Sequence, residues 1–171
     1  YNPARGFVLQ LAAEATPPIV VVSAPGELTE FLVAIAEGDT DPAAGAEVAE
    51  RVGEVAEGIG GAELRAEVEA LLGAAVARFE SEASEGDAPT SAARDALLAV
   101  GEDVSTRLVA DALARVECPA EVVDARTVVR TDDAFGAAAP EVDEIRNRAA
   151  AELLPRVAAG RVPVMQGFVG A

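Results

Sequence analysis

A run of four β-branched residues at positions 19–22 (Ile-Val-Val-Val) constrains the fold of this 171-residue chain more than any other feature. Such a run suits a strand that is buried on both faces, as the strands of parallel sheets are. Strand character returns at residues 121–124 and 162–166, and a further short extended piece is expected around 127–130. Because helical patterns separate these strands, we predict an α/β fold built on a parallel sheet.

Helical spacing of apolar residues fills most of the remaining chain. We expect helices over residues 4–15, 29–35 (with Thr29 as the N-cap), 43–58, 68–79, 92–100, 104–116 and 140–157. Gly60 and Gly61 interrupt the pattern between the third and fourth helices, and the acidic segment 81–89 is expected to be a surface loop. In parallel sheets ligands bind at the carboxyl ends of the strands, so the loops that follow the strands are the candidate binding segments.

The charge of the chain excludes several classes of partner. There are 30 acidic and 13 basic residues, which gives a formal net charge of −17 at pH 7. A surface of this sign repels phosphate backbones and anionic lipids, so we expect neither nucleic acid nor a membrane as partner. The sequence has no signal-peptide pattern at its start, and a cytoplasmic location is expected. Adaptation to high salt and a halotolerant host remain two open explanations of the acidic excess.

Missing residue types exclude further chemistry. The chain has no His, and all 13 basic residues are Arg. A Ser-His-Asp triad, an imidazole metal site and the phosphate-binding lysine of a Walker-type loop are therefore excluded. The single cysteine, Cys118, cannot form an intrachain disulfide or a zinc cage, and we expect it to be a small buried apolar residue. No metal site is expected.

Three segments carry the candidate chemistry. Residues 23–29 (Ser-Ala-Pro-Gly-Glu-Leu-Thr) follow the first strand. Their hydroxyls and helix amides could bind a carboxylate or phosphate. Alternatively, the segment is only a tight turn followed by a Thr cap. Glu102, in residues 101–105, could pair with a substrate ammonium group, or could be an ordinary acidic residue at a helix start. Residues 130–136 (Arg-Thr-Asp-Asp-Ala-Phe-Gly) could line a pocket, or could be a solvated connection pinned by Phe135.

The order of these segments resembles that in the aspartate kinase family. Residues 19–29 resemble its apolar strand, Ser-Ala, short glycine-bearing loop and Thr. Residues 91–105 resemble its segment that ends in Leu-Leu-x-x-Gly-Glu-x-x-Ser and bears a substrate-binding Glu. Residues 124–136 are similar to its Asp-x-Arg and Arg-Thr-Asp-x-x-Phe-Gly run, which is the most specific piece, and residues 162–170 to its Gln-Gly-Phe-x-Gly strand exit. Glu27 departs from the pattern, because several relatives carry a neutral or basic residue there.

The resemblance implies a three-layer α/β/α sandwich with a mainly parallel sheet, present here in part. It implies phosphorylation of the β-carboxylate of L-aspartate by ATP and Mg²⁺, the entry to lysine, threonine and methionine biosynthesis. It also implies site residues: Ser23, Ala24 and Thr29 would hold the substrate, Glu102 would pair with its amino group, and Arg130, Thr131 and Asp132 would belong to a pocket loop.

The resemblance further implies that residues 1–171 are a partial catalytic domain, the amino-acid-binding lobe. The family's first strand (Lys-x-Gly-Gly), its Gly-Arg-Gly-Gly-Ser-Asp loop and its nucleotide-binding half have no counterpart in the chain. We therefore expect no catalytic residue and no kinase activity on this piece alone, with L-aspartate and ATP bound by a full-length, homo-oligomeric parent. Two alternatives remain: another amino acid kinase, acting on glutamate or acetylglutamate, or a non-catalytic acidic module derived from one.

Overall fold

The computed structural model describes residues 10, 16–39, 41–83, 89–135 and 137–167. It divides into two compact units, which are treated separately below. The sheet unit comprises Tyr1–Val22, Thr106–Asp133 and Ala138–Ala171, and the helical unit comprises Ser23–Ser105 and Ala134–Ala137. Apart from Gln10, the helix predicted over residues 4–15 lies outside the described residues.

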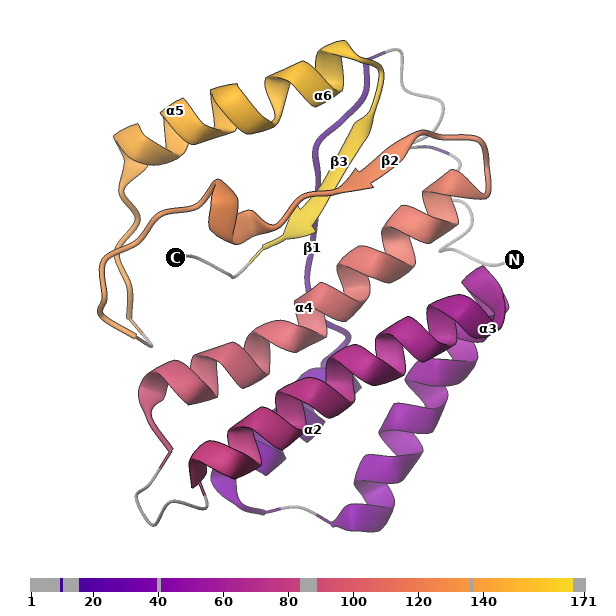
Figure 1. Cartoon of the computed structure of the whole chain (residues 1–171), viewed down its shortest axis with the longest axis vertical. Helices are drawn as coiled ribbons and strands as arrows, with labels where there is room; N and C mark the ends of the chain where they lie inside the picture. The colour runs from indigo at the N-terminus through magenta and orange to yellow at the C-terminus, as the bar shows by residue number, and fades with distance from the viewer. Residues whose placement is uncertain (1–9, 11–15, 40, 84–88, 136, 168–171) are drawn as a thin grey trace. The chain divides into compact units, whose positions relative to one another are not determined.

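Three parallel strands form the centre of the sheet unit, as predicted. They are β1 (Val20–Val22), β2 (Ala120–Val122) and β3 (Val162–Gln166), in the order β1-β3-β2 (Figure 1). All five residues of the central strand β3 are buried. Val21 on the edge strand β1 is 60% exposed, so the prediction that this run is buried on both faces is wrong. Among the described strands, β1 is at the edge of the sheet and has a neighbouring strand, β3, on one side only.

An apolar cluster packs between the sheet and the last turns of helix α4 (Ser91–Ala114). Its buried members are Val20, Leu113, Cys118, Val162 and Val164. Cys118 is a free, buried thiol, which confirms the sequence-based interpretation, and this burial raises its pKa. The thiol is an apolar filler here, because its charged form would be poorly solvated.

The chain after β2 does not continue as the extended piece predicted around residues 127–130. It forms instead a 3₁₀ turn, η1 (Ala125–Thr127), which Asp124 caps by accepting a hydrogen bond from the amide of Arg126 at 3.0 Å. A short polar side chain that bonds to the amide two residues ahead favours a turn over an extended chain. That local bond overrides the strand propensity of the valines that follow.

The helical pattern over residues 140–157 corresponds to two helices rather than one. They are α5 (Val142–Glu152) and α6 (Leu154–Ala158). Pro155 accounts for the interruption, because proline has no amide to bond to the preceding helical turn. Pro140 lies before α5 and forms an isolated antiparallel bridge with Thr131.

The helical unit is built from α2 (Gly26–Glu37), α3 (Pro42–Ala83) and the first part of α4. Gly61 has φ 73° and ψ −166°, a conformation that only glycine adopts readily, and α3 turns back on itself there (Figure 1). The predicted break at Gly60 and Gly61 is therefore confirmed.

An arginine connects the two halves of α3. The guanidinium of Arg65 contacts three carboxylates, those of Glu50 at 2.8 Å, Glu57 at 2.9 Å and Glu69 at 2.7 Å. These hydrogen bonds hold the pKa of Arg65 well above its usual range. Glu50 and Glu57 precede Gly61 and Glu69 follows it, so the cation links both sides of the bend.

Helix α4 is continuous over a stretch for which two helices, 92–100 and 104–116, were predicted. Gly101 lies within it and is buried. The low helix propensity of glycine would favour a break, but the packing of Gly101 outweighs it.

Among the described residues, no helix is long and apolar enough to cross a membrane.

Candidate functional site

The loop between β1 and α2 carries the candidate residues Ser23 and Ala24, and the candidate Thr29 lies within α2. Helix α2 begins at Gly26 with Pro25 as its N-cap, so the prediction that Thr29 caps this helix is wrong. Thr29 lies one turn inside, where its amide and its hydroxyl both donate to the carbonyl of Pro25, at 3.0 and 3.2 Å. Pro25 was expected to be part of the turn. It is instead the N-cap of α2, four residues before the cap predicted at Thr29.

This arrangement creates a place for an anion at the start of α2. The first amides of a helix have no partner within the helix and form its positive end. Ser23 and Thr29 are exposed and lie on either side of these amides along the chain. Two hydroxyls beside a helix N-terminus are suited to bind a carboxylate or a phosphate.

The charge at this helix start is balanced from α3. Glu27, in the first turn of α2, accepts a hydrogen bond from Nε of Arg51 at 3.1 Å. Arg51 also pairs with Glu47 at 2.6 Å. The carboxylate of Glu27, the residue that departs from the family pattern, is therefore partly neutralised where an anionic ligand would approach.

A close approach of two backbones brings α4 to this loop. A methyl group built on Gly101 would lie 2.7 Å from Cβ of Ala24 and 3.4 Å from Cδ1 of Leu32. The distance of 2.7 Å is too short for two carbon atoms, so only glycine fits here without displacement. Residue 101 thus lies against the loop that follows β1, and Glu102 is the next residue of α4.

Glu102 is placed differently from the prediction. It lies in the middle of α4 rather than at a helix start, so an ordinary interaction with a helix dipole does not explain it. Its side chain is buried, with 6% exposure, and Glu102 is engaged in at least one polar or electrostatic interaction. A buried carboxylate is rare and costly, so it usually has a specific role.

The third candidate segment, residues 130–132, belongs to the sheet unit. The carbonyl of Arg130 accepts from the amide of Glu141 at 2.9 Å, and Asp132 binds Ala139 through its amide (3.1 Å) and through its Oδ1 (3.0 Å). With the bridge between Thr131 and Pro140, these bonds form the paired base of a loop. Asp132 therefore has a structural role in closing this loop.

Arg130 is half-buried, and its guanidinium forms no ion pair with any described residue. Most arginines of the described segments are paired with carboxylates, as Arg65 and Arg156 are. A half-buried cation without such a pair is suited to bind an anionic ligand.

The candidate residues thus fall into two groups. In the helical unit, Ala24 and Gly101 are in contact. Ser23 directly precedes Ala24, and Glu102 directly follows Gly101. Thr29 lies five residues after Ala24. Arg130, Thr131 and Asp132 form the base of a loop in the sheet unit, while Gly136 lies outside the described residues.

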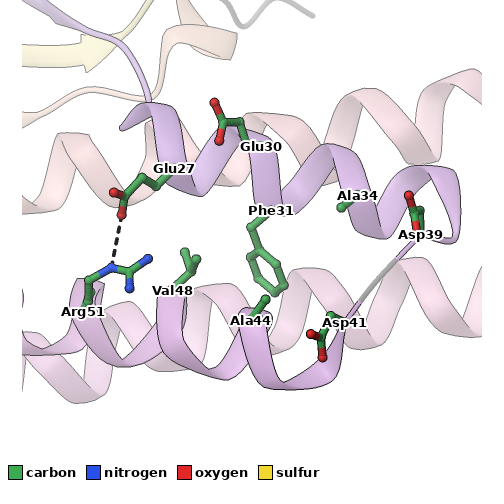
Figure 2. A pocket seen from close by; sticks show the side chains of 10 residues that line it. Glu27, Glu30, Phe31, Ala34, Asp39, Asp41, Ala44, Val48 and Arg51 are labelled. Atoms are coloured by element: carbon green, nitrogen blue, oxygen red, sulfur yellow. Dashed lines mark hydrogen bonds and ion pairs between the residues drawn. The ribbon is translucent and has the colours of Figure 1, made fainter.

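Sequence reasoning missed a groove between α2 and α3, shown in Figure 2. It has a volume of about 440 Å³ and an apolar floor around Phe31, with acidic side chains at both ends. The lining residues are Glu27, Glu30, Phe31, Ala34, Asp39, Asp41, Ala44, Gly45, Val48 and Arg51. Of its acidic residues, the sequence analysis singled out only Glu27, since nothing local distinguishes the others.

Within the described segments, no group of three or more His, Cys, Asp or Glu side chains could hold a metal ion. In the helical unit, the polar groups of the candidate residues are hydroxyls, helix amides and one buried carboxylate. Such groups recognise a small molecule that carries both positive and negative charge.

The chain is similar to known proteins over nearly its whole length. The model of the amino acid kinase family matches residues 3–171. Lysine-sensitive aspartokinase 3 of Escherichia coli (strain K12) is 40% identical over 83 residues, which are 48% of this chain and 18% of that enzyme.

Two solved structures of E. coli aspartokinase III are similar over 98% of this chain. The complex with aspartate and ADP (R-state) matches with a TM-score of 0.78, and the complex with lysine and aspartate (T-state) with 0.82, each at 31% identity. The chain spans 37% of the length of these relatives.

Proposed function

The chain belongs to the amino acid kinase family, and from this premise we propose that it is the amino-acid-binding part of an aspartate kinase. The proposed reaction transfers a phosphoryl group from ATP to the β-carboxylate of L-aspartate. The longer protein would act in lysine, threonine and methionine biosynthesis, as a cytoplasmic homo-oligomer.

One observation carries this proposal. Glu102 is 6% exposed in the middle of α4, and the residue before it lies against Ala24, in the loop that leads into α2. A buried carboxylate and a helix N-terminus in the same unit have opposite charges, and a zwitterion needs a group of each sign. In the proposed complex Glu102 binds the ammonium group of aspartate, and Ser23, Ala24 and Thr29 bind a carboxylate.

The proposed chemistry suits a chain without histidine. The β-carboxylate of aspartate has a pKa of about 4, so it is already ionised at neutral pH and needs no general base. Phosphoryl transfer depends mainly on positioning and on cations that neutralise the developing charge. In the proposed reaction, Mg²⁺ would arrive with ATP, and the other cations would come from the rest of the longer protein.

The solved relatives support the choice of substrates. The R-state structure of E. coli aspartokinase III contains aspartate and ADP, and the T-state structure contains lysine and aspartate. Since the chain covers 37% of those proteins, we propose that the nucleotide binds largely outside residues 1–171 of the longer protein.

The proposal is tested by assaying the natural full-length protein with ATP, Mg²⁺ and one amino acid at a time. L-aspartate, L-glutamate and N-acetylglutamate are compared, and the acyl phosphate is trapped with hydroxylamine as a hydroxamate. We expect product with aspartate at a kcat/KM at least about tenfold above the others, because glutamate has an extra methylene group and N-acetylglutamate also lacks the ammonium group.

The other outcomes distinguish the alternatives. Preference for glutamate or acetylglutamate would replace aspartate kinase by another amino acid kinase. No product with any of the three would favour a non-catalytic acidic module. The 171-residue chain, assayed in parallel, is expected to give no hydroxamate above the protein-free control.

A further inference from the structure

Gln166 holds an unusual place in the sheet unit. It is the last residue of the central strand β3 and is 5% exposed, among apolar neighbours that are also buried. A buried carboxamide is tolerated only when its polar atoms have partners. Its Oε1 accepts a hydrogen bond of 2.7 Å from the amide of Ala125, which is itself fully buried.

This bond replaces a main-chain bond of the parallel ladder. The amide of Val123 donates to the main-chain carbonyl of Val164 at 2.9 Å. Two residues further along both segments, the amide of Ala125 donates to the side chain of Gln166. The main chain of Gln166 pairs with Val22 of β1 on its other side. The chain after β2 therefore leaves the sheet at Ala125, but the side chain of Gln166 still bonds it to the end of β3.

The segment held in this way is a closed turn. Asp124 caps it through Arg126, the hydroxyl of Thr127 donates to the carbonyl of Asp124 at 2.7 Å, and the amides of Val128 and Val129 both donate to the carbonyl of Ala125. A turn with this many internal bonds moves as one body. Its bond to Gln166 therefore sets its position relative to β3.

The turn leads directly into the paired base of the loop that begins at Arg130. Only Val129 separates Val128 from Arg130, and Arg130 to Asp132 are then fixed by Ala139, Pro140 and Glu141. The position of the unpaired guanidinium thus depends on the turn that Gln166 holds.

We propose that Gln166 is a positioning residue, whose carboxamide fixes the turn at Ala125 and so the position of Arg130 in the sheet unit, where the guanidinium would bind an anionic group. The expected effect of Gln166 on aspartate binding rests on the proposed function. Its expected effect on the turn does not. Gln166 touches no reacting atom in this account. It acts through Ala125 and Arg130.

The test uses three variants of the natural full-length protein. Gln166→Met keeps the length of the side chain but removes the acceptor, and Gln166→Glu keeps an acceptor oxygen. Val164→Ala is the control, because it destabilises the same strand from the apolar core without touching the turn. Hydrogen exchange is measured on peptides covering residues 124–131, and KM for aspartate and for ATP is measured with kcat.

We expect Gln166→Met to speed exchange in residues 124–131 by about tenfold, the factor that corresponds to one lost buried hydrogen bond. KM for aspartate should rise by a similar factor, with KM for ATP within about twofold. Gln166→Glu should restore both values toward wild type. Val164→Ala should lower the melting temperature without a selective change in KM for aspartate.

Unchanged exchange in Gln166→Met would overturn the inference, as would equal increases of KM for aspartate in Gln166→Met and Val164→Ala. If the wild-type protein phosphorylates no amino acid, the proposed function fails. The exchange measurement then decides by itself whether Gln166 positions the turn.

Discussion

The backbone of Gly101 lies directly against the side chain of Ala24, so that a methyl group on residue 101 would come within 2.7 Å of Cβ of Ala24. This contact allows a long helix to approach the loop after β1 more closely than any other residue at position 101 would permit. It also determines where the buried carboxylate of Glu102 lies in the helical unit.

Gly101→Ala should therefore destabilise the chain, although alanine is the better helix former. Alanine in place of a glycine inside a helix normally stabilises by roughly 0.5–1 kcal/mol, whereas overpacking costs about 1–3 kcal/mol. Denaturant unfolding of the 171-residue chain measures the net effect. Gly73→Ala is the matched control, because Gly73 is also helical but has open space around it, and it should stabilise. Stabilisation by both substitutions would contradict the contact.

Arg65→Met should lower the melting temperature more than Arg78→Met does. Arg65 holds three carboxylates across the bend at Gly61, whereas Arg78 forms a single exposed pair with Glu82. Loss of the cation leaves Glu50, Glu57 and Glu69 to repel one another. Added NaCl should reduce the difference between the two variants, since salt screens exposed charges. Equal melting temperatures at low salt would show that the Arg65 contacts contribute little.

Salt should stabilise the chain itself. At a net charge of −17 the folded state suffers self-repulsion, which NaCl screens. The melting temperature, followed by circular dichroism from 0.05 to 1 M NaCl at pH 7, should rise by about 2–4 °C for each kcal/mol of repulsion removed. A melting temperature that is constant or falls with salt would contradict this expectation.

Cys118 should make stability depend on pH above about 9. Burial raises the pKa of this thiol from its ordinary value of 9.0, so the folded chain keeps the proton longer than the unfolded chain does. The contribution of the thiol is therefore complete below the unfolded pKa and is lost as pH rises through the folded pKa. Unfolding free energies measured between pH 7.5 and 10 should fall in the wild type.

The sequence makes this measurement unusually clean. The chain has no His and no Lys, and its one tyrosine is Tyr1, so few other groups titrate in this range. Cys118→Ala should remove most of the decline with pH. A decline of the same size in Cys118→Ala would assign it to another group.

Features that depend on local pattern were predictable from the sequence. The strand at residues 162–166 has the predicted bounds, because a continuous apolar run between Gly160 and Gly167 leaves little choice. The bend in α3 was predictable from Gly60 and Gly61, because glycine readily adopts the positive φ that Gly61 has. The turn at η1 was missed, although Asp124 carries the ordinary signal of an Asx-type cap.

Features that depend on contacts between distant residues were not predictable. The continuity of α4 follows from the packing of Gly101 on Ala24, 77 positions earlier in the chain. The bond between Ala125 and Gln166 joins residues 41 positions apart. Of the candidate site, the sequence identified the residues, but the burial of Glu102 and the Pro25 cap of α2 required the fold.

The most direct test of this account is the substitution Glu102→Gln in the natural full-length protein, with kinetics measured separately for aspartate and ATP. If Glu102 binds the substrate ammonium group, kcat/KM for aspartate should fall by at least about tenfold, the loss of one charge-assisted hydrogen bond, while KM for ATP stays within about twofold. Asp103→Asn, the same change of charge one residue along α4, should leave both near wild type. Equal effects of Glu102→Gln on the two substrates, or no effect on either, would contradict the assignment.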